Sequence, residues 1–336
     1  MELCKFIASF FVVFIHASFP GSLGSAVDCL ARFAVPTFFM ISGYFNYQAT
    51  SSQIIRRIKH LVKLFILASL ARLLWNCISI ELNSGSTIAY LRTFIPESDE
   101  LVSWIVLHKP PYTGHLWYLN AMIACYLVFL GFVRFGGEES TNYRPFYTLC
   151  SILFTYLFAF GIFAPISGTD SPLIVRNGWF LGLPMFGAGL FIRQYQEKIF
   201  TNFQLSGKKL VLLLLAGILL TFMQWKTFPI GMMAFGTLIE VLALMLLMVS
   251  HPKIFVRSKR AEKIVLKLGP LSMWIYLFHL TLIIAYEDVC QQTLQAVLGE
   301  LEPYLYPLII AAASLLTAIA FECFTGLLRK PRKGNA

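Results

Sequence analysis

Long apolar runs separated by short polar connections cover almost the whole chain. Each run approaches the roughly 20 residues that a helix needs to cross a hydrocarbon layer of about 30 Å. The hydrophobic windows predict helical spans at residues 4–19, 26–47, 58–80, 115–133, 145–165, 177–192, 208–224, 228–249, 266–286 and 304–328. The pattern therefore predicts an all-α integral membrane protein, a bundle of about ten transmembrane helices.

Composition supports this class and leaves no room for a large soluble domain. Hydrophobic residues make up 57% of the 336 residues and charged residues only 13%, and the mean hydropathy is +0.71, well outside the range of soluble domains. The 7 cysteines are scattered, without CxxC or His-Cys metal spacing. We expect one polytopic membrane domain over residues 1–336 and no metal site.

The net charge of +10 does not indicate a nucleic-acid partner, because the basic residues lie in short loops between apolar runs and at the C-terminus. Most of the 27 Lys and Arg residues fall on one side of the predicted spans. Cytoplasmic loops carry such an excess of Lys and Arg. The asymmetry predicts that both termini are cytoplasmic.

The first apolar run carries a lysine and a histidine. Lys5 and His16 are eleven residues apart, so a helix would separate them by roughly 16 Å along its axis. An imidazole at that depth is a functional candidate, here a general base that accepts a proton from a hydroxyl, because idle polar groups are costly in hydrocarbon. The alternative is a histidine satisfied by a neighbouring helix. Lys5 is either a topology anchor or a cation that meets an anionic cosubstrate.

The second run adds further polar residues. Asp28 and Arg32 are four residues apart, which predicts an ion pair on one helical face. This pair is either structural or orients His16 or an acceptor. Pro36 predicts a kink. Ser42 with Gly43 is either a nucleophile and its turn or, as we favour, a point of close helix contact.

A basic cluster follows the second run, and three polar residues complete the candidates. The cluster holds Arg56, Arg57, Lys59, His60 and Lys63. Positive-inside bias explains it, but a phosphate-rich ligand such as coenzyme A would also find a site there, with Arg56, Arg57 and Lys59 as the candidates. His115, Glu240 and His279 are secondary candidates. A lone histidine among aromatic residues is more often a packed residue with one hydrogen bond.

Several segments, in order, resemble the acyltransferase 3 family of integral membrane acyltransferases over nearly the whole chain. They are the basic-x10-His spacing of Lys5 to His16, RFAVPTFFMISGYF, RRIK, GHLWYLNAM, GLPMFGAGLF and SMWIYLFHL. The resemblance implies a multi-pass protein of the bacterial inner membrane that moves an acyl group, usually acetyl, from cytoplasmic acyl-CoA to a hydroxyl of an extracytoplasmic glycan or cell-envelope acceptor. In short, it implies O-acetylation and polysaccharide modification.

The resemblance also assigns roles to residues. His16 matches the family's essential histidine. Lys5 stands where the family usually has arginine, and Arg56 or Arg57 with Lys59 matches the basic pair after the second span, in a register that stays open. Polysaccharide exporters resemble the same family, so a transporter or flippase of a polysaccharide intermediate is the alternative function, in which the buried histidine relays protons.

Overall fold

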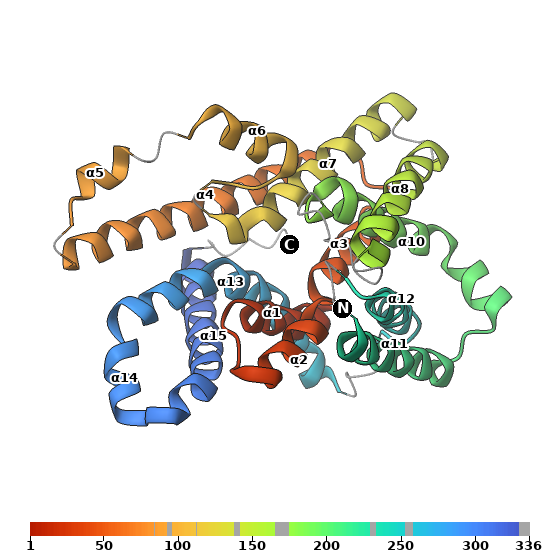
Figure 1. Cartoon of the computed structure of the whole chain (residues 1–336). Coiled ribbons are helices and arrows are strands. Elements are labelled where there is room, and N and C mark those ends of the chain that lie inside the picture. Colours follow the sequence, from red (N-terminus) through yellow and green to blue (C-terminus); the bar gives the residue numbers. More distant parts are fainter. Residues whose placement is uncertain are drawn as a thin grey trace. The chain divides into compact units, whose positions relative to one another are not determined.

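The computed structural model describes residues 1–83, 85–92, 96–111, 113–137, 142–164, 175–228, 233–252 and 258–328 (Figure 1). These residues form helices and connections, and no strand occurs among them. By their internal contacts they divide into two units, one of Met1–Val27 with Phe255–Ala336 and one of Asp28–Ile254. The boundary lies inside helix α2 (Gly21–Ala31).

Within the described ranges, 7 helices are long and apolar enough to cross a membrane. They are Gly21–Tyr44, Ser51–Leu82, Gly114–Gly136, Arg144–Phe163, Gly207–Thr227, Lys259–Val289 and Gln291–Gly326. The shorter helix α12 (Phe235–Ser250) is also apolar. The predicted all-helical, multi-pass class is confirmed. The number of about ten spans and the cytoplasmic position of both termini stay predictions.

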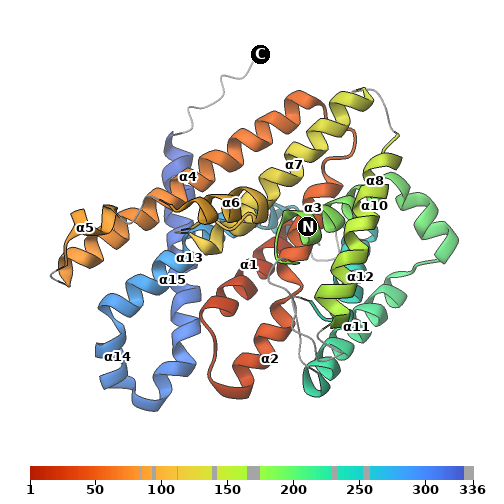
Figure 2. The same ribbon diagram turned by 45° about the horizontal axis from the view of Figure 1, so that its top comes forward.

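The first unit joins the two ends of the chain. It contains α1 (Glu2–His16), the start of α2, α13 (Lys259–Val289), α14 (Gln291–Leu298) and α15 (Glu302–Leu328). Helix α13 packs against α1 and α15 (Figures 1 and 2). Trp274 of α13 stacks on Phe278, with ring centroids 5.9 Å apart, and also contacts Phe321 of α15. Aromatic packing therefore fixes α13, the helix that carries His279.

The second unit holds the middle of the chain. Its elements are α3 (Ala34–Tyr44), α4 (Ser51–Leu82), α5 (Thr87–Arg92), α6 (Ser98–Leu107), the 3-10 helix η1 (Gly114–Leu116), α7 (Trp117–Gly136), α8 (Arg144–Tyr156), the π-helices η2 (Leu157–Phe163) and η4 (Gly178–Gly182), α10 (Leu183–Phe203), α11 (Gly207–Thr227) and α12. The main pairings are α11 with α12, α3 with α10 and α4 with α7. Its core is aromatic: Phe39, Phe129, Phe146 and Phe186 are fully buried.

Helices α3 and α10 cross with their backbones in contact. A Cβ atom added at Gly43 would lie 1.8 Å from the carbonyl oxygen of Phe186, and one at Gly189 would lie 1.9 Å from that of Met40. Small residues allow helices to approach this closely in membranes. Of the two interpretations of the Ser42–Gly43 pair, close helix contact is the one that Gly43 fulfils.

The second predicted span is interrupted near its proline. Helix α2 ends at Ala31 and α3 begins at Ala34. A proline ring clashes with the carbonyl of the residue four positions earlier, which for Pro36 is Arg32. The interruption therefore lies upstream of the proline, directly after the Asp28–Arg32 turn.

Candidate functional site

The clearest polar feature of the first unit is a pair of histidines. His16 is the last residue of α1, and His279 lies on α13. Their ring centroids are 5.2 Å apart, and the ring planes are inclined by 39°. His279 is fully buried, whereas His16 is partly exposed. The fold thus brings together two histidines from opposite ends of the chain.

The hydrogen bonding of His279 fixes its tautomer. Its Nδ1 atom lies 2.7 Å from the main-chain oxygen of Tyr276. A carbonyl oxygen only accepts hydrogen bonds, so Nδ1 carries the hydrogen and, in the neutral ring, Nε2 holds the lone pair. The bond runs back one helical turn within α13 and sets the orientation of the ring beside His16.

At the other end of α1, Lys5 is paired with Glu2. The Lys5 Nζ atom donates to Glu2 Oε1 over 2.9 Å, and both side chains are partly exposed. The Glu2 carboxylate lies over α13, because a Cβ atom at Gly269 would be 1.7 Å from Glu2 Oε2. The predicted basic residue of the donor site is therefore already held by an internal carboxylate.

These contacts give α1 and α13 a common direction. Glu2 lies beside Gly269 and His16 beside His279, so the two helices run parallel. The ten-residue step from Gly269 to His279 corresponds to about 15 Å of helix. When two helices cross a membrane in the same direction, the chain between them must cross it an odd number of times. The spans predicted from the sequence place seven crossings between α1 and α13.

In the second unit, the basic cluster near the start of α4 divides by face. Arg56 and Lys59 are exposed and three residues apart, so they share one face of the helix. Arg57 points inward, and its Nη1 atom donates to Asn46 Oδ1. The sequence leaves open whether Arg56 or Arg57 forms the basic pair with Lys59. In the structure Arg56 and Lys59 point outward, whereas Arg57 points inward.

Asn46 connects Arg57 to two helices. Its Nδ2 atom donates to the main-chain oxygen of Ser42 on α3 over 2.6 Å, and to the hydroxyl of Tyr126 on α7 over 3.2 Å. Asn46 itself is fully buried. The guanidinium of Arg57 therefore completes a hydrogen-bonded junction among the end of α3, the first turns of α4 and the middle of α7.

The predicted ion pair between Asp28 and Arg32 is present, with 2.6 Å between Asp28 Oδ2 and Arg32 Nη2. Arg32 lies in the interruption between α2 and α3. The pair therefore bridges the last turn of α2 and the break that follows it.

The two remaining candidates of the second unit are buried. His115, in η1, is 5% exposed. Glu240, on α12, is 6% exposed, and its Oε2 atom has no hydrogen-bond partner among the described residues. Helix α11 approaches it closely, since a Cβ atom at Gly217 would lie 2.7 Å from the backbone nitrogen of Glu240. In the part of the chain that the structure describes, no group of three or more His, Cys, Asp or Glu side chains could hold a metal ion.

Sequence reasoning missed three residues whose hydrogen bonds position the candidate side chains Lys5 and Arg57. Glu2 follows the i, i+3 spacing of helical ion pairs with Lys5 and could have been found by it. Asn46 and Tyr126 are 80 residues apart, and no local pattern links them. Their connection depends on how α3, α4 and α7 pack.

Comparison with known proteins yields one match. The model of the acyltransferase 3 family, described as an acyltransferase domain, matches residues 1–323. No curated protein and no solved structure matches the chain. The family match covers almost the full length and both units. The chain therefore belongs to the acyltransferase 3 family and is a multi-pass membrane acyltransferase.

Proposed function

We propose that the protein transfers an acetyl group from cytoplasmic acetyl-CoA to a hydroxyl of an extracytoplasmic glycan or other cell-envelope acceptor, in the inner membrane of a bacterium. Membership of the acyltransferase 3 family supports the reaction class. The observation that carries the proposal is the His16–His279 pair on α1 and α13, 5.2 Å apart between ring centroids. It offers a positioned imidazole on the same helix as a basic residue for the donor.

Each unit contains cations suited to the phosphates of the donor. Lys5 lies near the start of α1, and Arg56 with Lys59 forms an exposed basic face near the start of α4. Guanidinium and ammonium groups bind phosphate through charge-assisted hydrogen bonds. Because Glu2 already pairs with Lys5, a phosphate that binds Lys5 competes with this carboxylate. We assign Arg57 to the Asn46 junction and not to the donor.

His16 is the proposed general base. Its imidazole takes the proton of an acceptor hydroxyl as the hydroxyl oxygen attacks the thioester carbonyl. The tetrahedral intermediate then collapses, the carbon–sulfur bond breaks, and the departing thiolate takes the proton from the imidazolium. An ester and free coenzyme A result, so atoms and charge balance. His279, oriented by the Tyr276 carbonyl, is a positioning residue that holds His16.

A transporter is the rival function, and consumption of the thioester separates the two. Proteoliposomes containing the full chain receive radiolabelled acetyl-CoA on the basic-loop side and an envelope glycan extract on the other. An acetyltransferase releases free coenzyme A and forms a hydroxylamine-labile labelled ester on the glycan. Movement of the glycan across the bilayer without loss of thioester would contradict the proposal.

A further inference from the structure

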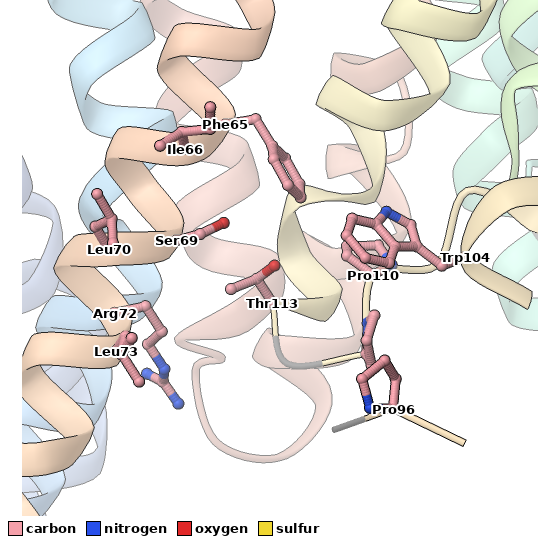
Figure 3. Close-up of a pocket in the computed structure, with 11 residues that line it drawn as sticks. Phe65, Ile66, Ser69, Leu70, Arg72, Leu73, Pro96, Trp104, Pro110 and Thr113 are labelled. Carbon is pink, nitrogen blue, oxygen red and sulfur yellow. The ribbon is translucent and has the colours of Figure 1, made fainter. Parts of the chain in front are cut away.

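The second unit contains a pocket with a volume of about 330 Å³ between α4, α6 and the segment that precedes η1 (Figure 3). Phe65 and Trp104 form one wall, with ring centroids 6.2 Å apart and nearly parallel rings. Leu73, Pro96 and Pro110 add further apolar surface. The volume is at the low end of the ~300–1,000 Å³ typical of ligand pockets, which suits a segment of one hydrocarbon chain.

Three polar side chains interrupt this apolar lining: Ser69, Arg72 and Thr113. In Figure 3 Ser69 and Thr113 lie on opposite sides of the pocket, and the Arg72 side chain extends from α4 beside Leu73, with its guanidinium directed away from the two hydroxyls. The Ser69 hydroxyl oxygen is buried and has no hydrogen-bond partner among the described residues. The pocket thus has a guanidinium, which binds anionic oxygens through charge-assisted hydrogen bonds, and separate hydroxyl groups.

Arg72 lies far from the end of α4, within an apolar span where a charged side chain is unusual. Arg72 lies ten residues before the end of α4 at Leu82, about 15 Å along the helix axis. A cation inside an apolar span is costly and usually faces a partner or cavity. Here it faces a pocket whose other walls are mostly apolar.

The rim of the pocket is apolar and exposed, on a helix long and apolar enough to cross a membrane. Ile66 and Leu70 line the pocket and are 50% and 57% exposed. Only Ser51, Ile54, Leu64 and Ala68 of α4 are buried, and the other residues of this helix are exposed or partly exposed. A ligand that enters past these side chains comes from the hydrocarbon layer and carries apolar chains of its own.

We propose that this pocket binds a phosphate-bearing membrane lipid, with one chain against Phe65 and Trp104 and the phosphate against Arg72. The apolar walls and the single cation match the two parts of such an amphiphile. The site is independent of the proposed acetyl transfer. Thr113 lines the pocket and is two residues before His115, so the lipid would lie next to the segment that holds this buried histidine.

Native mass spectrometry of the purified full chain tests the proposal. The probes are palmitoyl-oleoyl phosphatidylglycerol, diacylglycerol with the same chains, and glycerol 3-phosphate. We expect phosphatidylglycerol to be retained about tenfold better than diacylglycerol, as one charge-assisted contact implies. Arg72→Ala removes this preference and Arg72→Lys keeps most of it. Arg134→Ala, an exposed arginine of α7 outside the pocket, is the matched control and leaves it unchanged.

Two further arms keep the test decisive. Leu73→Trp fills the space for the chain, so it lowers retention of both lipids, and unchanged retention would overturn the proposal. Equal retention of the two lipids by the unmodified protein, or the same preference in Arg72→Ala and Arg134→Ala, would also overturn it. Displacement of phosphatidylglycerol by equimolar glycerol 3-phosphate would show a site for a free phosphate group and not for a lipid. A monodisperse elution profile establishes that each variant is folded.

Discussion

The imidazole of His16 lies beside that of His279, with 5.2 Å between the ring centroids. One ring ends α1 and the other lies within α13, and α1 and α13 pack together along their lengths. Because Nδ1 of His279 donates to the Tyr276 carbonyl, the orientation of the His279 ring beside His16 is fixed. The pair gives the proposed base a defined neighbour.

Replacing His279 tests its role as a positioning residue. We expect His279→Ala to lower kcat on the order of a hundredfold, the loss that a displacement of about 1 Å produces, with the KM for acetyl-CoA unchanged and the pH profile of kcat shifted. Steady-state kinetics across pH measures both. Leu277→Met, a volume-conserving change at a buried neighbour, should alter neither. An unchanged pH profile in His279→Ala would leave only a packing role.

Substitutions of Glu2 and of Lys5 should change the KM for acetyl-CoA in opposite directions. Lys5→Ala should raise the KM for acetyl-CoA by about two- to fivefold, as expected for a partly exposed charge pair. Glu2→Gln should lower it, because a neutral amide does not compete with phosphate for the ammonium group. Lys5→Arg keeps the charge and should bind the donor at least as well.

Donor titration at fixed acceptor measures these changes, and kcat should stay the same in all three variants. Lys263→Ala, an exposed lysine at the start of α13, serves as the control with no effect. A rise in KM for Glu2→Gln would show that the carboxylate supports donor binding and does not oppose it.

The contact between α3 and α10 predicts that alanine substitutions at two glycines differ in their effect on stability. Gly43→Ala places a Cβ atom 1.8 Å from the Phe186 carbonyl oxygen, and overpacking of this kind costs about 1–3 kcal/mol. Gly131→Ala on α7 meets nothing within 4 Å and should leave the stability unchanged or raise it, since alanine favours the helix. Thermal unfolding in detergent compares the two. Equal melting temperatures would contradict the close crossing.

His108 predicts a pH dependence outside the membrane-spanning segments. Burial lowers the pKa of His108 from 6.5 to about 4, and its Nδ1 atom accepts a hydrogen bond from Gly178 N over 3.2 Å. Because the folded protein favours the neutral ring, this stabilisation is present above the unfolded pKa near 6.5 and is lost as the pH falls towards 4. The melting temperature should therefore fall over this window.

His108→Asn provides the control for this loss. An amide oxygen also accepts a hydrogen bond but does not titrate in this range, so the melting temperature of the variant should depend less on pH between 6.5 and 4. Equal pH dependence of the two proteins would assign the effect to other groups.

Much of the fold is readable from one-dimensional patterns. Each of the ten apolar windows overlaps a helix of the structure, with residues 165 and 229–232 of two windows outside the described residues, because burial in hydrocarbon depends mainly on the length and polarity of a segment. Three of the predicted spans do not meet the length and polarity expected of a membrane-crossing helix. Helices α1 and α12 are short, with 15 and 16 residues, and the second half of α10 contains the polar run RQYQEK. The Asp28–Arg32 pair follows from helical spacing in the same way.

The candidate site is less readable, because its contacts join distant segments. In the sequence His16 and His279 are separate candidates, because no local pattern indicates that α1 and α13 pack together. Arg57 looked equivalent to Arg56, and only the buried Asn46 distinguishes the two. Periodicity predicts which face of a helix is polar. It does not predict which helix lies against that face.

The most direct test of the central claim is acceptor-dependent release of coenzyme A from acetyl-CoA by purified protein, compared between the unmodified chain and His16→Ala. Loss of a general base should lower the rate about 10²–10⁴-fold, while the KM for acetyl-CoA and the melting temperature stay close to those of the unmodified protein. Release by a folded His16→Ala variant at the rate of the unmodified protein would contradict the assignment of His16 as the base.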